Sequence, residues 1–245
     1  MIDRFQSAMS SLQQFSRAQE VSANNLANMN TPGYKKDSLF YRQLEEEMGG
    51  DGVNPEIMQN LSMQAGSFEE TGNTFDLAIN GEGFFEVEYE DEAMLSRNGQ
   101  FTLDGEGFLR DQNGAYVNGA NGRIHLPQFH QMAEEKNEPP RVDISPDGSI
   151  RLNDELVDQV KLMSVDDHTQ LERRANSYLV TGEGQQAEED SLSEIQQGFF
   201  EAGNVDPLTE MTEMMTNMRL FESQQRALRT TDEMLGRVTT ELGQF

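Results

Sequence analysis

Cysteine and tryptophan are both absent from the 245 residues, and no long hydrophobic run occurs. Without cysteine the chain has no disulfides, no thiolate metal ligands and no thiol nucleophile. No apolar run approaches the roughly 20 residues that a membrane-spanning helix needs. The first residues, MIDRFQSAMSSLQQ, also lack the apolar core of a secretory signal. We therefore expect no membrane insertion and, if the protein leaves the cytoplasm, export without a cleaved signal peptide.

Lysine is scarce, with four residues against 44 aspartates and glutamates, and the formal net charge is −26. Residues 45–205 carry 34 of these acidic residues but only nine of the 18 lysines and arginines. Such a surface repels nucleic acid and anionic membranes, so neither is an expected partner. No ordered ligand spacing supports a cation-binding surface. The favoured interpretation is a well-hydrated outer surface, as in a protein from a high-salt habitat.

Catalytic patterns are missing as well. The glycine pairs near Gly81 and Gly105 lack the third glycine of a dinucleotide site, and no phosphate-binding loop follows. His125, His130 and His168 do not have metallopeptidase spacing. A carboxylate pair cannot be recognised among so many acidic residues, and no nucleophile elbow occurs, although a Ser-His-Asp set stays open. We predict no enzyme, no cofactor and no metal site.

The N-terminal residues have the spacing of an amphipathic helix. Apolar side chains recur at intervals of three and four between Ile2 and Leu26, which places them on one helical face. The stretch ANNLANMNTPGYKK (23–36) then predicts the helix end. Its asparagines compete for backbone groups, and Pro32-Gly33 favours a turn.

The C-terminal residues predict a longer helix. Asp206 is placed to cap it, and Pro207 suits the first helical position. An apolar residue recurs every seven positions, and further methionines widen this stripe. The recurring residues are Met214, Phe221, Leu228, Leu235 and Leu242. A stripe of this length has to be buried, and the N-terminal helix is the nearest candidate; an ordinary core is the alternative.

The middle of the chain predicts β-structure. Seven Asn-Gly or Asp-Gly pairs between residues 80 and 148 suit hairpin turns, and strand-sized runs such as FFEVEY (84–89) lie between them. The expected fold class is α+β, with terminal helices paired as a coiled-coil-like α domain around an inserted, mainly antiparallel β domain. The expected parts are a helical domain of 1–36 plus 204–245, an extended linker at 37–66, a β domain at 67–182 and a second linker at 183–203.

Three motifs now resemble one family. ANNLANMNTPGYKK, FDLAINGEGFFEVE and GFFEAGNVDPLTEMTEMMTNMRLFESQQRALRTTDEMLG occur in the order found in the flagellar basal-body rod and hook family. The likeness covers about half of the chain and is strongest to rod proteins of FlgF (proximal) or FlgG (distal) type. MSSLQQFSRAQ stands where the family usually has a small, glycine-containing stretch. The proximal rod is the first interpretation because the chain is compact, the distal rod the second and the hook the third.

The resemblance implies a structural subunit that self-associates into a helical rod crossing the periplasm. Its implied partners are neighbouring rod and hook subunits and the flagellar export apparatus. Head-to-tail contacts between subunits that do not close into a ring generate a helical filament. Methionine side chains can adapt their shape to neighbouring subunits that are not identical. We expect the terminal helices to order on assembly and to supply the interface, with the residues around the helix ends. The expected interface residues are Phe5, Leu12, Phe15, Asn24, Asn25, Leu26, Asn28, Thr31, Gly33, Tyr34, Asn204, Val205, Asp206, Met211, Met214, Met218, Phe221, Leu228, Leu235 and Leu242.

Two other classes remain. A peptidoglycan-cleaving enzyme would place its carboxylates within residues 67–182. A carbohydrate-binding β module would need an aromatic platform, and the lack of tryptophan weakens that hypothesis.

Overall fold

The structure is a computed structural model of the chain, and it describes residues 2–43, 55–127, 129, 140–174, 178–182 and 185–242. Its contacts form two compact units. The helical unit comprises Met1–Ala27, Asp37–Asn60 and Val205–Phe245, and the β unit comprises Asn28–Lys36 and Leu61–Asn204. Residues 28–36 thus contact the β unit, although the sequence grouped them with the helices. The predicted domain boundaries stay a prediction.

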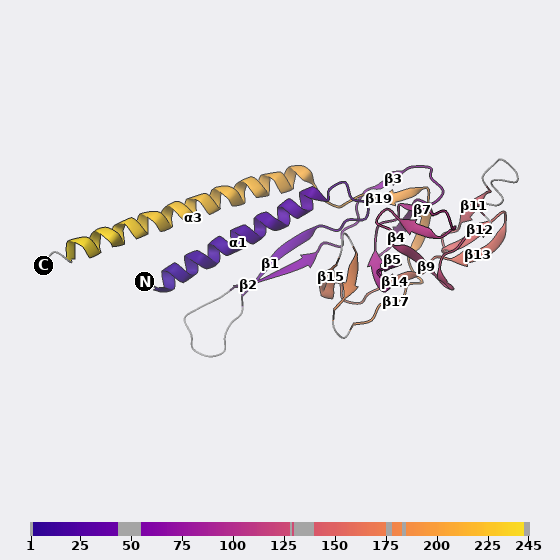
Figure 1. Cartoon of the computed structure of the whole chain (residues 1–245), viewed down its shortest axis with the longest axis horizontal. Helices are drawn as coiled ribbons and strands as arrows, with labels where there is room; N and C mark the ends of the chain where they lie inside the picture. The colour runs from indigo at the N-terminus through magenta and orange to yellow at the C-terminus, as the bar shows by residue number, and fades with distance from the viewer. Residues whose placement is uncertain are drawn as a thin grey trace. The chain divides into compact units, whose positions relative to one another are not determined.

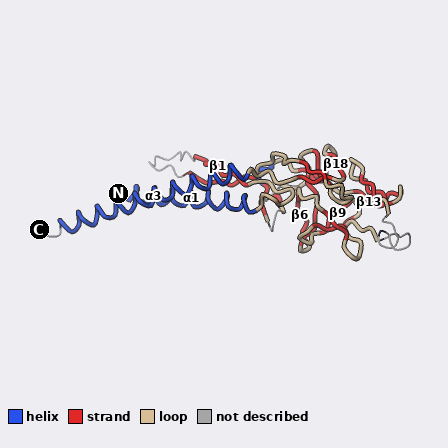
Figure 2. Tube along the Cα trace, turned by 90° about the horizontal axis from the view of Figure 1, so that it is seen from above, coloured by secondary structure: helices blue, strands red, loops and turns tan. Residues whose placement is uncertain are grey.

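Among its described residues, the helical unit contains two helices and two strands. Helix α1 (Ile2–Ala27) and helix α3 (Pro207–Leu242) pack against each other, and strand β1 (Asp37–Gln43) lies against α1. Figures 1 and 2 show the two helices running side by side. Strand β2 (Pro55–Leu61) pairs with β1 in a two-stranded sheet. The part of the chain predicted as an extended linker therefore contains two strands; its residues 44–54 lie outside the described residues.

Helix α3 begins as the sequence predicts. The Asp206 carboxylate accepts a hydrogen bond from the Leu208 amide at 3.2 Å and another from the Thr209 hydroxyl. Pro207 is the first helical residue, where its missing N–H costs no hydrogen bond. The predicted cap is confirmed.

In the part of the β unit that the structure describes, short strands form one large sheet and three small ones. The large sheet has the order β15-β16-β6-β5-β9-β8-β7; β10 pairs with β9, β14 with β5, and β17 with β14. Every pairing with a described register is antiparallel. The α+β class with a mainly antiparallel middle is confirmed.

The strands of this unit are three to six residues long in most cases. Those of the large sheet are β5 (Phe84–Tyr89), β6 (Glu92–Ser96), β7 (Phe101–Leu103), β8 (Leu109–Asp111), β9 (Tyr116–Gly119), β10 (Gly122–Arg123), β14 (Leu162–Ser164), β15 (Leu171–Arg173), β16 (Leu179–Thr181) and β17 (Glu188–Glu189). The small sheets pair β11 (Val142–Ile144), β12 (Ser149–Leu152) and β13 (Glu155–Gln159), β4 (Leu77–Asn80) with β18 (Glu194–Gln197), and β3 (Phe68–Glu70) with β19 (Phe199–Glu201). A short 3-10 helix, η1 (His168–Gln170), precedes β15.

The predicted turns are partly correct. Gly114 and Gly148 adopt φ of +92° and +85° and follow Asn113 and Asp147 at chain reversals, as expected. The prediction of a positive φ is wrong for Gly99, Gly105 and Gly119, and Gly119 is the last residue of β9. A Cβ there would approach the Gln159 carbonyl oxygen to 2.7 Å, so this glycine permits close approach of the backbone.

Two hairpins use turns without glycine. Glu90 and Asp91 connect β5 to β6 with φ of 53° and 64°, and Asn153 and Asp154 connect β12 to β13 with φ of 49° and 70°. Positive φ at both central positions is the geometry of a type I′ turn, which asparagine and aspartate tolerate best after glycine.

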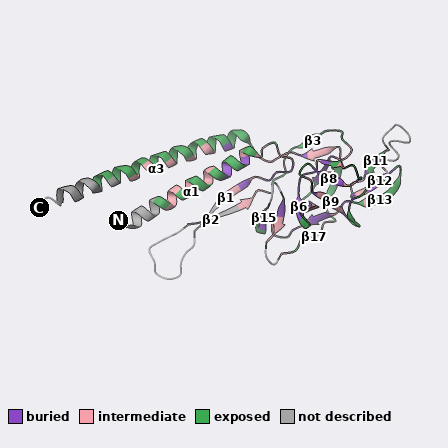
Figure 3. Ribbon diagram, in the orientation of Figure 1, coloured by how far each residue is buried: buried purple, intermediate pink, exposed green. Residues whose placement is uncertain are grey.

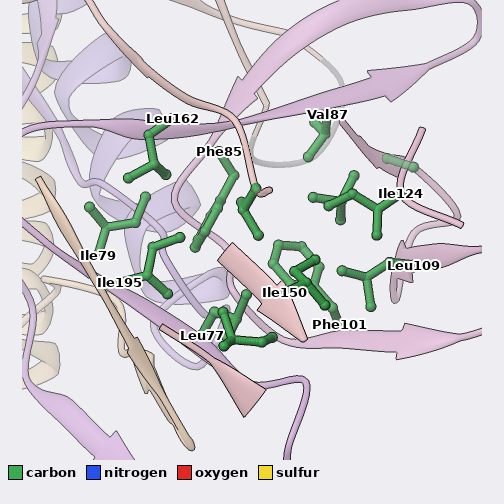
Figure 4. Packing of buried hydrophobic residues seen from close by; sticks show 14 of the residues in the cluster. Leu77, Ile79, Phe85, Val87, Phe101, Leu109, Ile124, Ile150, Leu162 and Ile195 are labelled. Carbon is green, nitrogen blue, oxygen red and sulfur yellow. The ribbon is translucent and has the colours of Figure 1, made fainter. Parts of the chain in front are cut away.

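The core lies on both faces of β5. Successive side chains of a strand point to opposite faces, so Phe84 and Phe85 enter different clusters. Phe85 belongs to the larger cluster, where it meets the Phe101 ring edge to face at 5.1 Å between centroids. Figure 4 shows this cluster, to which Leu77, Ile150 and residues of several other strands contribute. The β unit therefore has its own buried core.

Candidate assembly site

The seven-residue stripe of α3 is half-buried where the structure describes its side chains. Met214, Phe221 and Leu228 are all half-buried. Helix α1 packs along α3, so we attribute this burial to α1. Leu235 and Leu242 lie in the same helix, but their side chains are outside the described residues.

Helix α1 contributes a matching half-buried face. Leu12, Phe15 and Leu26 are half-buried, whereas Asn24 is exposed. Phe5 lies within α1, and its side chain is outside the described residues. These three half-buried residues belong to the face that the three-and-four spacing predicts, and Val21, which lies outside that spacing, is buried as well.

A second apolar face of α3 remains uncovered. Leu208, Met211, Met215 and Met218 are 75%, 45%, 53% and 50% exposed. Their spacing of three, four and three places them on one side of the helix, and we call them the α3 row. Figure 3 shows much of this part of α3 as exposed. A row of large apolar side chains in solvent marks an interaction surface more often than isolated exposed residues do.

Asn25, near the end of α1, satisfies backbone groups with its side chain. The side-chain amide of Asn25 is buried, donates to the Asp37 carbonyl oxygen and accepts from the Asp37 amide, both at 2.9 Å. It thereby ties the last turn of α1 to the start of β1. Farther along, the Asn28 carbonyl oxygen accepts from the Thr31 amide at 2.9 Å and closes the turn that follows.

Gly33 and Tyr34 are packed tightly in the β unit. Gly33 has a φ of +67°, and a Cβ at this position would lie 2.2 Å from the Arg97 carbonyl carbon and 2.3 Å from the Asn98 nitrogen. The Tyr34 ring is buried, and the Arg173 guanidinium lies over it at 4.3 Å from the centroid. Both features show that the segment after α1 packs against residues far away in the sequence.

Asn204 joins three chain segments near the entry to α3. Its Oδ1 accepts from the Lys36 amide at 2.7 Å, and its Nδ2 donates to the carbonyl oxygens of Ser62 and Gln64 at 2.8 and 2.9 Å. Its own amide donates to the Tyr34 carbonyl oxygen at 3.1 Å. Val205, the next residue, is half-buried.

Three charged side chains that sequence reasoning missed are buried beside this segment. Lys35 Nζ lies 2.6 Å from Glu201 Oε1, and Arg97 Nη1 lies 3.4 Å from Glu201 Oε2. Burial lowers the pKa of Lys35, and Glu201 opposes this by attracting the charged form. Burial likewise lowers the pKa of Arg97, again against the attraction of Glu201. The available sequence signal was the pair Lys35-Lys36, half of all the lysines, beside a turn.

Each described histidine lies near an oxygen atom through its Nε2, and the Nδ1 of His168 is buried without a hydrogen-bond partner. His125 Nε2 is 2.9 Å from the Glu106 carbonyl oxygen, and His168 Nε2 is 3.9 Å from Glu82 Oε2. His130 lies outside the described residues. Across the ranges that the structure describes, no three His, Asp or Glu side chains are grouped as a metal site. No helix there is both long and apolar enough to cross a membrane.

Three family descriptions match successive parts of the chain. "Flagella basal body rod protein" matches residues 5–35, "Flagellar hook protein FlgE/F/G D1 domain" residues 78–152, and "Flagellar basal body rod FlgEFG protein C-terminal" residues 196–241. The first contains most of α1, and the third contains most of α3.

Similar proteins match over nearly their whole length. The chain is 32% identical to the flagellar basal-body rod protein FlgF of Mesorhizobium japonicum, covering 94% of each chain. It is 29% identical to FlgF of Caulobacter vibrioides, covering 94% of this chain and 93% of that one. The flagellar basal-body rod protein FlgG of Bacillus subtilis is 28% identical, with 96% and 97% covered.

Proposed function

Because this chain belongs to the flagellar basal-body rod protein family and is a structural subunit of that rod, we propose that it joins the rod through its terminal helices. The basal body is thus its location. In this proposal the half-buried stripe of α3 holds α1 in a coiled-coil-like pair within one subunit. The α3 row then contacts neighbouring subunits.

The observation that carries this proposal is the exposure of the α3 row. These four side chains are between 45% and 75% exposed in the single chain. Covering them removes apolar surface from water, which favours association. Three of the four are methionines, whose flexible side chains adapt to neighbours that are not identical.

We place this subunit in the proximal rod. The chain is 245 residues long, and an FlgF relative reaches 32% identity, whereas the FlgG relatives of Bacillus subtilis and Agrobacterium fabrum reach 28% and 29%. A distal-rod subunit is the alternative position. The implied partners are further copies of this chain, adjacent rod subunits and the flagellar export apparatus, which exports the subunit.

Assembly and helix formation are coupled in this proposal. An isolated pair of long helices with an uncovered apolar row gains stability when neighbours cover it. Dilute monomer should therefore show less helix by circular dichroism than the same chain at high concentration. Full helicity that does not depend on concentration would contradict the coupling.

Charged substitutions in the α3 row test the interface. We expect Met211→Glu with Met218→Glu to reduce incorporation into basal bodies by at least about tenfold, since burying two carboxylates at a contact costs several kcal/mol. Thr216→Glu is the matched control, because Thr216 is exposed on another face of the same helix. Immunoblots of purified basal bodies measure incorporation, and export into the periplasm is measured in the same cells.

The control separates the interface from other effects. If the double variant is exported and incorporates as well as Thr216→Glu, the α3 row is not a subunit contact.

We also propose that the chain has no catalytic activity, which is supported by the structural role named for its relatives. Cleavage of purified peptidoglycan by the full chain would overturn that part.

A further inference from the structure

One carboxylate serves two buried cations in the β unit. The side chains of Lys35, Glu201 and Arg97 are 3%, 2% and 4% exposed. Glu201 uses one oxygen for each cation, at 2.6 and 3.4 Å. The other acidic groups that attract Arg97, Glu82 and Asp190, make no ion pair with it among the described residues. The neutralisation of both cations therefore depends chiefly on Glu201.

Glu201 also binds backbone groups from two further places. Its Oε1 accepts from the Gly66 amide at 2.8 Å, and its own carbonyl oxygen accepts from the Gly33 amide at 2.6 Å. Lys35 Nζ adds a hydrogen bond to the Gln64 carbonyl oxygen at 3.0 Å. The segments around residues 33–35 and 64–66 are thus both attached to this one residue of β19.

Asn204 repeats this arrangement three residues later. Its side chain binds Lys36 on the first segment and Ser62 and Gln64 on the second. The stretch Phe199–Asn204 therefore holds both segments at two points. Both segments and this stretch lie at boundaries of the β unit, which comprises Asn28–Lys36 and Leu61–Asn204.

The energetics make this attachment all or none. A buried charge that loses its partner is strongly destabilising, because it has already given up its contact with water. If Phe199–Asn204 separates, Lys35 and Arg97 lose their shared carboxylate together. Lys35 then keeps its hydrogen bond to the Gln64 carbonyl oxygen and Arg97 its hydrogen bond to the Gly81 carbonyl oxygen, but neither keeps a bonded carboxylate, which favours exposure of both cations and movement of the segments around them.

We propose that Phe199–Asn204 is a latch, in which docking of Glu201 and Asn204 fixes residues 33–36 and 61–66 in one cooperative step. When the latch opens, these two segments are released together while the large sheet stays folded. The sheet has its own core around Phe85, a cluster to which neither segment contributes, whereas Leu61 and Met63 pack against the second cluster, around Phe84. This inference rests on the contacts of the β unit and not on the role of the α3 row.

Hydrogen exchange of the full chain tests the latch. The reporters are the amides of Gly33, Lys36 and Gly66, which donate to Glu201 or Asn204. The core references are the amides of Leu109 and Ile124, which donate to the carbonyl oxygens of Ile124 and Val117 and whose side chains belong to the Phe85 cluster. In Glu201→Gln we expect exchange at the reporters to rise at least about 100-fold and exchange at the core references to stay within about threefold.

Glu194→Gln is the matched control, since Glu194 is exposed in the neighbouring strand β18. It should leave both sets of amides unchanged. Equal acceleration of reporters and core in Glu201→Gln, or no acceleration at the reporters, would overturn the latch.

The unmodified chain provides a second test should Glu201→Gln not fold. In low denaturant the three reporters should share one opening free energy, lower than that of the core references. Reporters that open independently of one another, or only with the core, would overturn the proposal.

Discussion

At the scale of single residues, the local sequence pattern predicts backbone conformation but does not predict contacts with residues far away in the chain. The Pro32-Gly33 pair predicts a turn with positive φ, and Gly33 has that conformation at +67°. Gly33 lies against the backbone of Arg97 and Asn98, which are more than 60 residues away in the sequence. The local sequence therefore does not predict this contact. The buried charges of Lys35 and Glu201 are hidden for the same reason, because the two residues are 166 positions apart.

Gly33→Ala should destabilise the β unit strongly. The new methyl group would lie 2.2 to 2.3 Å from backbone atoms, which cannot move as a flexible side chain can. Gly72→Ala is the matched control, because Gly72 has the same φ of +67° and nothing within 4 Å of the added Cβ. We expect about 1 kcal/mol of lost unfolding free energy for Gly72→Ala and at least about 2 kcal/mol more for Gly33→Ala.

Urea unfolding followed by circular dichroism measures both variants. Equal losses for the two would show that φ alone matters at Gly33 and that the close approach to Arg97 does not exist.

Tyr178 should make stability depend on alkaline pH. Its buried hydroxyl donates to the Asp111 carboxylate, and burial together with this carboxylate raises its pKa well above 10.0. The folded chain therefore keeps a proton that the unfolded chain releases above about pH 10. The stability contributed by neutral Tyr178 is fully present below that pH and is lost as pH rises beyond it.

Tyr178→Phe isolates this effect from the other tyrosines and the lysines. The unfolding free energy of the parent should fall more steeply than that of the variant above about pH 10. Parallel curves for parent and variant would show that Tyr178 titrates normally in the folded chain.

At the scale of helices and strands, periodicity predicts the helices well and the weak strands poorly. The spacing of Met214, Phe221 and Leu228 predicts the covered stripe of α3, and Asp206 predicts its start. The α3 row also consists of residues that the sequence placed in this stripe, but their exposure depends on where α1 lies. Strands β1 and β2 were missed because their neighbourhood is acidic and lacks alternation.

Asp206→Ala should weaken α3 at its first turn. The variant loses the bonds to the Leu208 amide and the Thr209 hydroxyl, at a cost of about 1 kcal/mol. Glu213→Ala is the control, because Glu213 is exposed farther along α3 and caps nothing. Urea unfolding followed by the helical circular dichroism signal compares the two, and an equal midpoint for both would contradict the cap's contribution.

At the scale of the whole molecule, the α+β class and the order of helix, β region and helix follow from the sequence. Heptad spacing, Asn-Gly turns and three family motifs all agree on this order. The grouping of residues 28–36 with the β unit could not be predicted, because it depends on Glu201 and Asn204 reaching back across the chain. The interpretation of the acidic middle region as a hydrated surface around a separate core stays a prediction.

The most direct test of the rod assignment is electron microscopy of basal bodies purified from a strain that lacks this gene, compared with the parent strain. We predict rods that are missing or that stop short, with recovery when the unmodified gene is restored. The stopping point identifies the segment, and loss of the rod at its proximal part is the result expected here. Complete rods and hooks in the deleted strain would contradict the account.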